Sequence, residues 1–249
     1  MTGGNRGIGR AIALALADDG FIVAVTARDT GTLADTVAAI EAHGGSALAL
    51  SCDVRNEESV ERMARHATAL GRVSTVIANA GIAGPTAPLH EMAFAGWRDC
   101  LATDLDGVFL TFRAFAPAMI ESGAGSLIAI SSMTGKRPLY GRTPYAAAKM
   151  GVIGLVRTLA VELGPHGIRV NAVCPGAVAG PRIEEVIRRQ AVTRGITEDE
   201  AMLAFTGASP LARLVDVNEV ASACAYLASD AAGSITGEDL NVTAGVVMY

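Results

Sequence analysis

The feature that most constrains the fold is a repeated alternation of apolar, strand-like runs with amphipathic, helical runs. Six runs have strand character, namely Phe21–Thr26, Ser46–Leu50, Val73–Ala78, Ser126–Ile130, Ile168–Val173 and Leu240–Val242. Such alternation is typical of parallel strands joined by right-handed crossovers, since each helix must return the chain to the same edge of the sheet. No linker or internal repeat divides the 249 residues, and 51% of them are hydrophobic. We therefore predict one α/β domain over residues 1–249, a doubly wound parallel sheet with helices on both faces.

Charge and composition exclude several classes of partner. The formal net charge is −5, whereas nucleic-acid binding usually needs a basic excess. No signal peptide is recognised, and no apolar run reaches the ~18 residues of a membrane span, so we predict a cytoplasmic protein with no membrane partner. The four cysteines and four histidines have no metal-ligand or disulfide spacing, and no metal site is predicted.

A glycine-rich stretch at the start of the chain points to phosphate binding. Thr2–Gly9 reads Thr-Gly-Gly-Asn-Arg-Gly-Ile-Gly and opens an alanine- and leucine-rich helix that runs to about Asp19. Glycines allow a tight turn and a close approach of backbone, and the helix N-terminus presents free N–H groups to a phosphate.

A second pattern carries acid–base chemistry. Tyr145 and Lys149 lie one helical turn apart, so phenol and ammonium share one face of a helix, and a nearby ammonium favours the phenolate form of a tyrosine. Ser132 follows the apolar run Ser126–Ile130, whose carboxyl end should deliver the hydroxyl to the sheet edge where ligands bind. The pair Tyr145 and Lys149 alone could equally be a solvated surface pair.

Together these residues resemble the short-chain dehydrogenase/reductase family, in its branch similar to 3-oxoacyl-carrier-protein reductases. Asn79-Ala80-Gly81 and Pro175-Gly176 resemble two further motifs of that family and stand in the right order. The resemblance implies a Rossmann-type fold and hydride transfer between a nicotinamide nucleotide and a ketone or secondary alcohol. It implies that Tyr145 exchanges the proton, Ser132 bonds the substrate oxygen and Lys149 holds the nicotinamide ribose. The cofactor contacts it implies are Gly3, Asn5, Arg6, Gly7, Ile8, Gly9, Arg28, Asp53, Val54, Asn79, Ala80, Gly81, Tyr145, Lys149, Pro175, Gly176 and Val178.

The residues after the second family strand favour NADP(H), with NAD(H) as the alternative. Ala27 stands where the family's ribose-binding acid is expected, and Arg28 follows it. A guanidinium suits phosphate recognition, and Arg6 in the glycine loop offers a second cation. Alternatively, Arg28 only begins the next helix and Asp29 caps it.

One position departs from the family pattern. The family usually has an asparagine in N-x-x-G-x-F, but the matching stretch here begins with Asp104. We include Asp104 among the predicted catalytic residues, where its carboxylate could hold a relay water that leads to Lys149. An ionised Asp104 would offset the positive field of Lys149 and move the activity optimum to higher pH. The alternative is that Asp104 simply caps helical backbone.

The start of the chain and the segment at residues 178–214 also stand out. Only Met1 precedes the glycine loop, so the family's central first strand has no sequence, and its loss should separate two strands by about 9–10 Å. We hypothesise that the natural start lies upstream. Residues 178–214 are charged and lack strand character, which is typical of a substrate lid.

The substrate itself is not specified by the sequence. Lys136, Arg137 and Arg142 precede Tyr145 and are the better candidates for binding an anionic substrate. The arginines of residues 178–214 are interspersed with acidic residues, which is typical of a solvated helix face. A non-catalytic nucleotide sensor, or a dehydratase or epimerase on the same scaffold, are the alternative functions. The family resemblance implies a homotetramer or homodimer, for which the helices around Phe109–Ile120 and Ala146–Leu163 are the candidate interface.

Overall fold

The computed structural model describes all residues from 1 to 249 and contains six parallel strands. The strands are β1 (Ile22–Ala27), β2 (Ser46–Ser51), β3 (Thr75–Ala78), β4 (Gly125–Ile130), β5 (Ile168–Pro175) and β6 (Asp239–Val242). Their ends lie within two residues of the predicted runs. β1 pairs with β2, and the other four pair in the order β3-β4-β5-β6. The predicted α/β fold with a doubly wound parallel sheet is confirmed.

Ten α-helices and several short helical turns connect these strands. The α-helices are α1 (Gly7–Asp18), α2 (Ala34–Ala42), α3 (Glu57–Thr68), α4 (Phe94–Leu101), α5 (Gly107–Ser122), α6 (Met133–Lys136), α7 (Thr143–Leu163), α8 (Pro181–Arg194), α9 (Glu198–Thr206) and α10 (Val217–Ala228). The 3₁₀ turns are η1 (Thr30–Leu33), η2 (Leu89–Glu91), η4 (Gly164–His166) and η5 (Asp230–Ala232), and η3 (Ala102–Asp106) is a π-helix.

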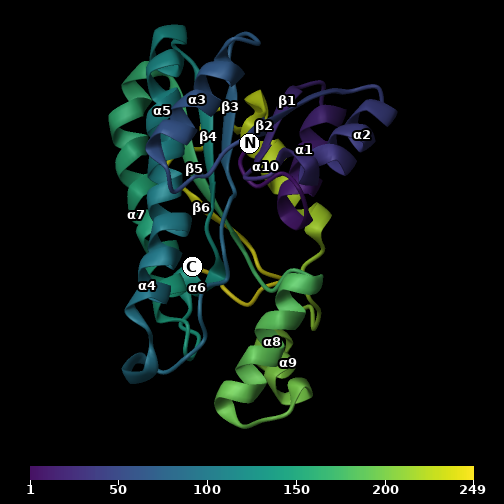
Figure 1. Cartoon of the computed structure of the whole chain (residues 1–249), viewed down its shortest axis with the longest axis vertical. Helices are drawn as coiled ribbons and strands as arrows, with labels where there is room; N and C mark the ends of the chain where they lie inside the picture. Colours follow the sequence, from purple (N-terminus) through teal and green to yellow (C-terminus); the bar gives the residue numbers. More distant parts are fainter.

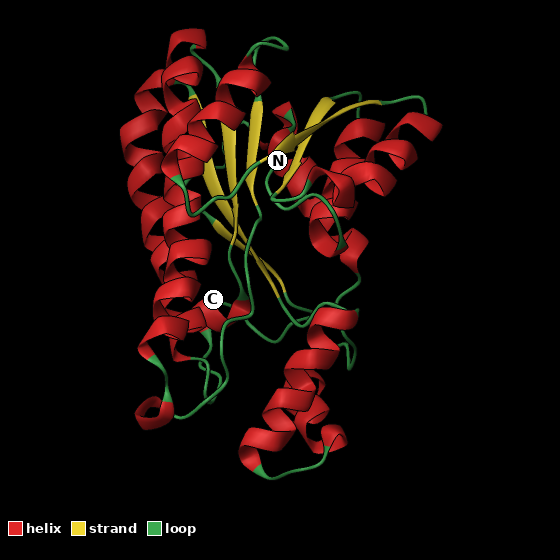
Figure 2. Ribbon diagram, in the orientation of Figure 1, coloured by secondary structure: helices red, strands yellow, loops and turns green.

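The helices form a layer on each face of the sheet (Figures 1 and 2). Helices α3, α5 and α7 lie on one face, where Phe112, Leu127 and Val156 belong to one buried cluster. Helices α1 and α10 lie on the other, where Ile12 and Leu227 belong to a second cluster. Alanine, valine, isoleucine and leucine dominate both clusters.

The sheet is divided at the position of the family's first strand. No strand precedes the glycine loop, and Met1 and Thr2 bridge β1 and β3. The amide of Thr2 donates to the Ile77 carbonyl at 3.0 Å, and the Thr26 amide donates to the Met1 carbonyl at 3.0 Å. Beyond this bridge the hydroxyl of Thr75 is buried without a hydrogen-bond partner. The two parts of the sheet are therefore joined across this position by a short bridge and not by a full strand.

The predicted lid segment folds as α8 and α9. A parallel bridge between Val178 and Val215 joins the two ends of the segment. Its apolar residues form a third, smaller cluster that includes Phe205 and also takes in Met133 and Val247 from outside the segment. The two helices project from the carboxyl end of the sheet (Figure 1).

Candidate active site

The glycine loop is held in place by Thr2 and Asn79. The Thr2 hydroxyl accepts from the amides of Asn79 and Ala80, each at 3.1 Å. In return, the Asn79 side chain donates to the carbonyls of Thr2 and Gly3 at 3.1 and 2.9 Å. The predicted motif residues Asn79 and Ala80 thus come to lie against the glycine loop, and Asn79 orders its backbone.

The geometry of this loop fits a dinucleotide phosphate. A Cβ atom on Gly9 would lie 1.9 Å from the Gly3 carbonyl oxygen, so only glycine allows this packing. Arg6, the N-cap of α1, makes no capping hydrogen bond through its side chain, and the first turn carries no acidic residue. Free N–H groups without a nearby carboxylate are the donor set that a phosphate requires.

The two serines at the end of β4 have different surroundings. The Ser131 hydroxyl donates to the Lys149 carbonyl at 2.8 Å and is fully used by the backbone. The Ser132 oxygen caps α6 by accepting from the Thr134 amide at 3.1 Å, which leaves its own O–H free to donate. The free hydroxyl favours Ser132, the serine that the sequence spacing selected.

Helix α7 brings Tyr145 and Lys149 to the same edge of the sheet. The Lys149 ammonium lies 5.6 Å from the centre of the Tyr145 ring and donates to the Ile130 carbonyl at 3.0 Å. The Lys149 side chain is 4% exposed and that of Asp104 is fully buried, and their charged atoms are 3.4 Å apart. Lys149 thus joins Tyr145 and Asp104, and Ser132 lies two residues after Ile130, whose carbonyl Lys149 contacts.

Asp104 lies in the π-helix between α4 and α5, a feature frequent at functional sites. Its Oδ1 accepts from the Ile82 amide at 2.7 Å, while Oδ2 has no partner other than Lys149. A Cβ on Gly81 would lie 3.3 Å from each of the two carboxylate oxygens. Asp104 thus holds the loop after β3 as well as Lys149, so the alternative in which it caps only helical backbone is wrong.

The predicted phosphate-reading arginines are exposed, and neither forms an ion pair. Arg28 follows β1, and Asp29 caps η1 by accepting from the Gly31 amide at 2.9 Å. Asp53 instead pairs with Arg55, with contacts of 3.0 and 2.8 Å. The Arg55 guanidinium, through these hydrogen bonds, holds the pKa of Asp53 below its usual range. Arg55 was not anticipated from the sequence.

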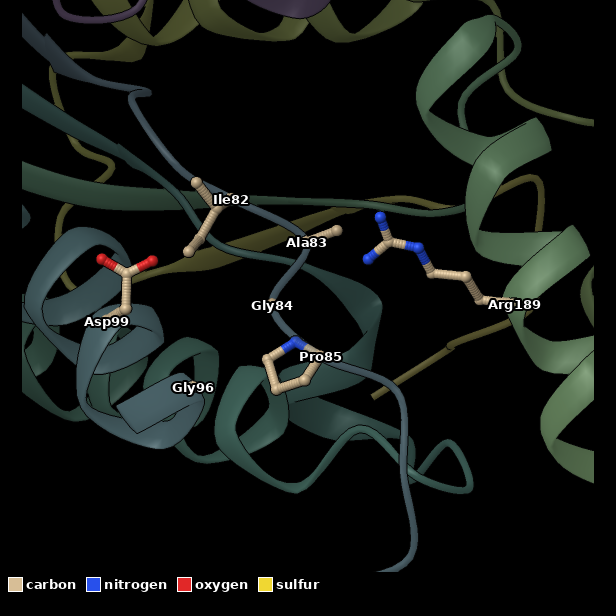
Figure 3. Close-up of a pocket in the computed structure, with 7 residues that line it drawn as sticks. All are labelled: Ile82, Ala83, Gly84, Pro85, Gly96, Asp99 and Arg189. Carbon is tan, nitrogen blue, oxygen red and sulfur yellow. The ribbon is translucent and has the colours of Figure 1, made fainter. Parts of the chain in front are cut away.

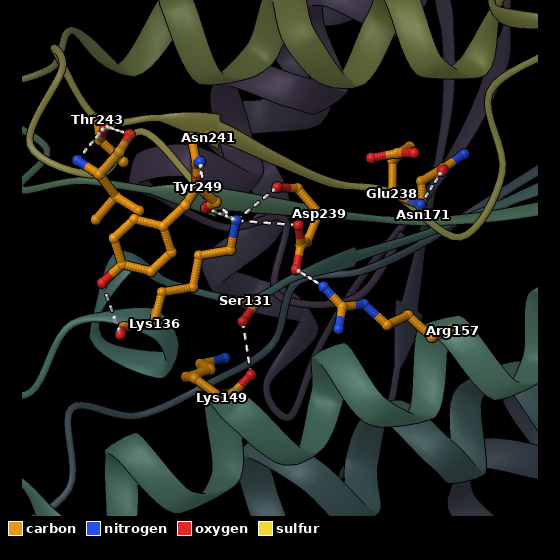
Figure 4. Close-up of polar contacts among 11 residues, drawn as sticks. Ser131, Lys136, Lys149, Arg157, Asn171, Glu238, Asp239, Asn241, Thr243 and Tyr249 are labelled. Carbon is orange, nitrogen blue, oxygen red and sulfur yellow. Dashed lines mark hydrogen bonds and ion pairs between the residues drawn. The ribbon is translucent and has the colours of Figure 1, made fainter.

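Two of the three predicted anion-binding residues are used elsewhere. Lys136 donates to Asn241 Oδ1 at 3.0 Å and to the main-chain oxygen of Tyr249 at 2.7 Å, and it pairs with Asp239 at 3.0 Å (Figure 4). Arg137 Nη1 lies 3.4 Å from the Ala204 carbonyl. Lys136 therefore ties the C-terminal residues to α6, and only Arg142 adjoins Tyr145, with its guanidinium carbon 4.8 Å from the ring centre.

A shallow pocket of about 320 Å³ lies beside the loop after β3 (Figure 3). Arg189 of α8 and Asp99 of α4 lie on either side of this loop, and the pocket does not include Ser132, Tyr145 or Lys149. The other lining residues are Ile82, Ala83, Gly84, Pro85 and Gly96. It therefore adjoins the predicted site without containing its reactive groups.

Pro175, Gly176 and Val178 lie at the end of β5. The Gly176 amide donates to the Val242 carbonyl at 2.8 Å, and a Cβ there would lie 2.9 Å from Thr243 Cα. The roles of Thr2 and Ser131 were not anticipated. Their hydroxyls act on distant backbone, and the only sequence signal was their position next to the two predicted motifs.

The carboxyl edge of the sheet thus carries a tyrosine, a lysine and a free serine hydroxyl near a glycine loop. This arrangement suits proton exchange with an alcohol or ketone held beside a bound dinucleotide. The fold and site therefore define an oxidoreductase that acts on hydroxyl and keto groups. The model of a family described as enoyl-(acyl carrier protein) reductase matches residues 3–247. The chain belongs to the short-chain dehydrogenase/reductase family, and within it is similar to 3-oxoacyl-carrier-protein reductases.

Individual relatives cover almost the whole chain. It is 38% identical to the 3-oxoacyl-[acyl-carrier-protein] reductase of Synechocystis sp., over 100% of this chain and 96% of that protein. It is 39% identical to the cis-4-hydroxycyclohexanecarboxylate dehydrogenase of Sinomonas cyclohexanicum, over 98% of this chain and 94% of that protein.

Solved structures agree with the fold. NAD+-bound xylitol dehydrogenase matches with a TM-score of 0.95 and 28% identity, over 98% of this chain and 96% of that chain. A variant of actinorhodin polyketide ketoreductase with NADPH matches with a TM-score of 0.94 and 35% identity, over 100% of this chain and 96% of that chain. The similarity to structures with bound nicotinamide nucleotides indicates a nicotinamide cofactor for this chain. No helix combines the length and the apolar character needed to cross a membrane.

Proposed function

We propose that this protein transfers hydride between NADP(H) and a ketone or secondary alcohol, with Tyr145 as the proton donor or acceptor. The observation that supports this most directly is the position of Lys149 between Tyr145 and Asp104, with the free hydroxyl of Ser132 at the end of the adjacent β4. When bound, the nicotinamide supplies or accepts the hydride.

The residues have distinct roles in this proposal. In reduction, the Tyr145 hydroxyl donates its proton to the substrate carbonyl oxygen, and in oxidation the phenolate removes the proton from the alcohol. The free O–H of Ser132 donates a hydrogen bond to the same oxygen and orients it. Since Ser132 is fixed as the N-cap of α6, its oxygen is already positioned before substrate binds.

Lys149 supports the phenolate and holds the nucleotide. An ammonium has three N–H donors, and two of those of Lys149 face the Ile130 carbonyl and the Asp104 carboxylate. The third is available for a ribose hydroxyl. Asp104 acts as a positioning residue, because its contacts with Lys149 and with the Ile82 amide fix both sides of the site.

The glycine loop would bind the pyrophosphate at the N-terminus of α1, and Arg6 and Arg28 would bind the 2′-phosphate of NADP(H). Both arginines are exposed and have no acidic partner, and Ala27 offers no carboxylate to a ribose hydroxyl. An unpaired guanidinium matches a phosphate dianion by charge and by geometry.

The catalytic role is tested with Y145F. We expect kcat for ketone reduction to fall by about 10²–10⁴ because the proton donor is lost, while nucleotide binding is retained. Tyr226, which is 45% exposed on α10, provides the matched control in Y226F. Near-normal turnover by Y145F would reject the assignment.

The cofactor preference is tested by titrating the protein with NADPH and NADH and following nucleotide fluorescence. The proposal is supported if the wild type binds NADPH more tightly than NADH. It also requires that R28Q and R6Q bind NADPH more weakly than the wild type while their affinity for NADH is unchanged. R72Q serves as the control, because Arg72 is exposed and precedes β3 at the opposite edge of the sheet. Tighter binding of NADH would assign the protein to NAD(H).

We also propose that α8 and α9 cover the substrate and that the protein is a homotetramer or homodimer. The outer faces of α5 and α7 keep Phe109, Met150 and Val161 exposed by 44, 51 and 78%. Apolar side chains on two adjacent helices suit packing across a two-fold axis. Sedimentation equilibrium gives the mass, and a monomer at all concentrations would contradict this assembly.

A further inference from the structure

The active-site region contains a buried positive charge that forms no ion pair with a carboxylate. Three charged residues belong to the buried residues of the protein, namely Asp104, Arg142 and Lys149. Asp104 and Lys149 pair with each other, and Arg142 forms no ion pair although it is only 3% exposed. A buried charge without a partner is costly, so an unpaired one calls for an explanation.

The hydrogen bonds of Arg142 are also incomplete. Nη2 donates to the Ala83 carbonyl at 2.6 Å, whereas Nε is buried without any acceptor. Nη1 makes no hydrogen bond either. Burial holds the pKa of Arg142 below its usual range. The charge of Arg182 acts in the same direction, while Tyr145 and the more distant groups Cys100 and Asp104 act against it without reversing the shift. The guanidinium therefore retains donors for which the protein itself supplies no acceptor.

Arg142 lies on the N-terminal side of Tyr145. Arg142 is the N-cap of α7, so Arg142, Tyr145 and Lys149 follow one another along one face of the helix. Lys149 lies after Tyr145, next to the proposed ribose site, and Arg142 lies before it. The Arg142 guanidinium stacks on the ring, with its carbon 4.8 Å from the ring centre.

A second unpaired guanidinium faces the same loop. Arg182 lies in the first turn of α8, is exposed, and has Nη1 3.5 Å from the Gly81 carbonyl, two residues from the carbonyl that Arg142 contacts. By contrast, Arg188 and Arg189 further along α8 both pair with Glu185. Arg142 and Arg182, which both contact the loop after β3, thus lack a carboxylate partner.

Helix α8 contacts the segment that leads into Arg142. Gln190 Nε2 donates to the Tyr140 carbonyl at 2.7 Å, while its Oε1 is buried without a partner. Since Arg142 is buried, a ligand would reach it after an outward movement of α8 that breaks this hydrogen bond.

We propose that Arg142, assisted by Arg182, binds a carboxylate of the substrate, so that the preferred substrates are ketones or alcohols with a carboxylate a few carbons from the reacting carbon. A carboxylate supplies the missing countercharge and accepts two N–H bonds from a planar guanidinium. This proposal rests on the proposed function, because the carbonyl must lie at Tyr145 while the carboxylate lies at Arg142.

The test compares kcat/KM for 4-oxocyclohexanecarboxylate and its methyl ester, which differ only in the charge of the group. We expect the wild type to prefer the acid by about tenfold or more, the value of one charge-assisted hydrogen bond. The ratio of the two kcat/KM values should fall about tenfold in R142Q and less in R182Q. The control R188Q removes a paired arginine from the same helix and should keep the wild-type ratio. Equal ratios in wild type and R142Q would overturn the proposal.

A binding measurement separates this proposal from the proposed function. Cyclohexanecarboxylate is titrated calorimetrically into the nucleotide-saturated protein, with its methyl ester as the neutral probe. If the wild type binds the acid more strongly than the ester and R142Q loses this preference, anion recognition by Arg142 is supported. Absence of ketone turnover in the same protein would then reject only the proposed function. No preference for the acid in the wild type overturns the anion site. If R142Q fails to fold by circular dichroism, the exposed R182Q variant decides, and an unchanged acid preference there overturns the proposal.

Discussion

Replacing Asp104 by asparagine removes a buried negative charge from the site while almost preserving its shape. The carboxylate can be no more than 9.0 Å from the Tyr145 ring centre, because Lys149 Nζ lies 3.4 Å from the carboxylate and 5.6 Å from the ring centre. Two unit charges about 9 Å apart interact by about 1.8 kcal/mol for an effective dielectric constant of about 20. Asp104→Asn should therefore favour the phenolate by a free energy of this order and move the pH–rate profile of alcohol oxidation to lower pH.

The assay is the pH dependence of kcat/KM for alcohol oxidation at saturating nucleotide, measured in buffers of constant ionic strength. Asp106→Asn is the matched control, since Asp106 lies two residues further along the chain and is exposed to solvent, where its charge is screened. Its profile should coincide with that of the wild type. An Asp104→Asn profile with an unchanged inflection would refute the reasoning and show that the Asp104 charge does not reach Tyr145.

Two further predictions concern the start of the chain and the glycine loop. In protein produced with Met1 as its first residue, burial lowers the pKa of the Met1 amino group from 8.0 to about 6. The unfolded chain then binds more protons between these values, so the free energy of unfolding should rise by about 2.7 kcal/mol from pH 5 to pH 9 through this group. Urea unfolding at both pH values measures the rise, and the same rise in a chain with extra residues before Met1, where this nitrogen is an amide, would contradict the cause. Gly9→Ala forces a Cβ to within 1.9 Å of the Gly3 carbonyl oxygen, so it should weaken NADPH binding by at least about tenfold and destabilise the fold by roughly 1–3 kcal/mol. Gly154→Ala, with nothing within 4 Å of its added Cβ on α7, is the control and should stabilise by up to about 1 kcal/mol; wild-type NADPH affinity in Gly9→Ala would count against the steric argument.

The strand positions and the fold class could be predicted because they depend on local patterns. β4 begins at Gly125 and ends at Ile130, within one residue of the apolar run, since a strand buried on both faces must be apolar along its whole length. The prediction that Ser132 and Tyr145 lie at the same edge of the sheet followed from the strand that ends before Ser132 and from the Tyr145–Lys149 motif. Neither required knowledge of contacts between distant residues.

The electrostatic partners could not be predicted, because they depend on which segments the crossovers bring together. Lys136 and Arg142 stand six residues apart and look equivalent in the sequence. Lys136 meets Asp239 and Asn241, more than 100 residues later in the chain, while Arg142 meets no carboxylate. The partner of Asp104 could not be predicted either. Its carboxylate accepts a hydrogen bond from the Ile82 amide, and this contact depends on the π-helix that turns the side chain inward.

The sequence by itself determined the parallel sheet, the glycine-rich start of α1 and the presence of groups able to exchange a proton, since each arises from side-chain periodicity or from the chemistry of a short motif. The tertiary structure alone decided which buried charges are neutralised. It paired Asp104 with Lys149 and left Arg142 unpaired beside Tyr145. The physical reason is that Coulomb interactions depend on distance through space and on burial, and neither quantity is encoded in the separation of residues along the chain.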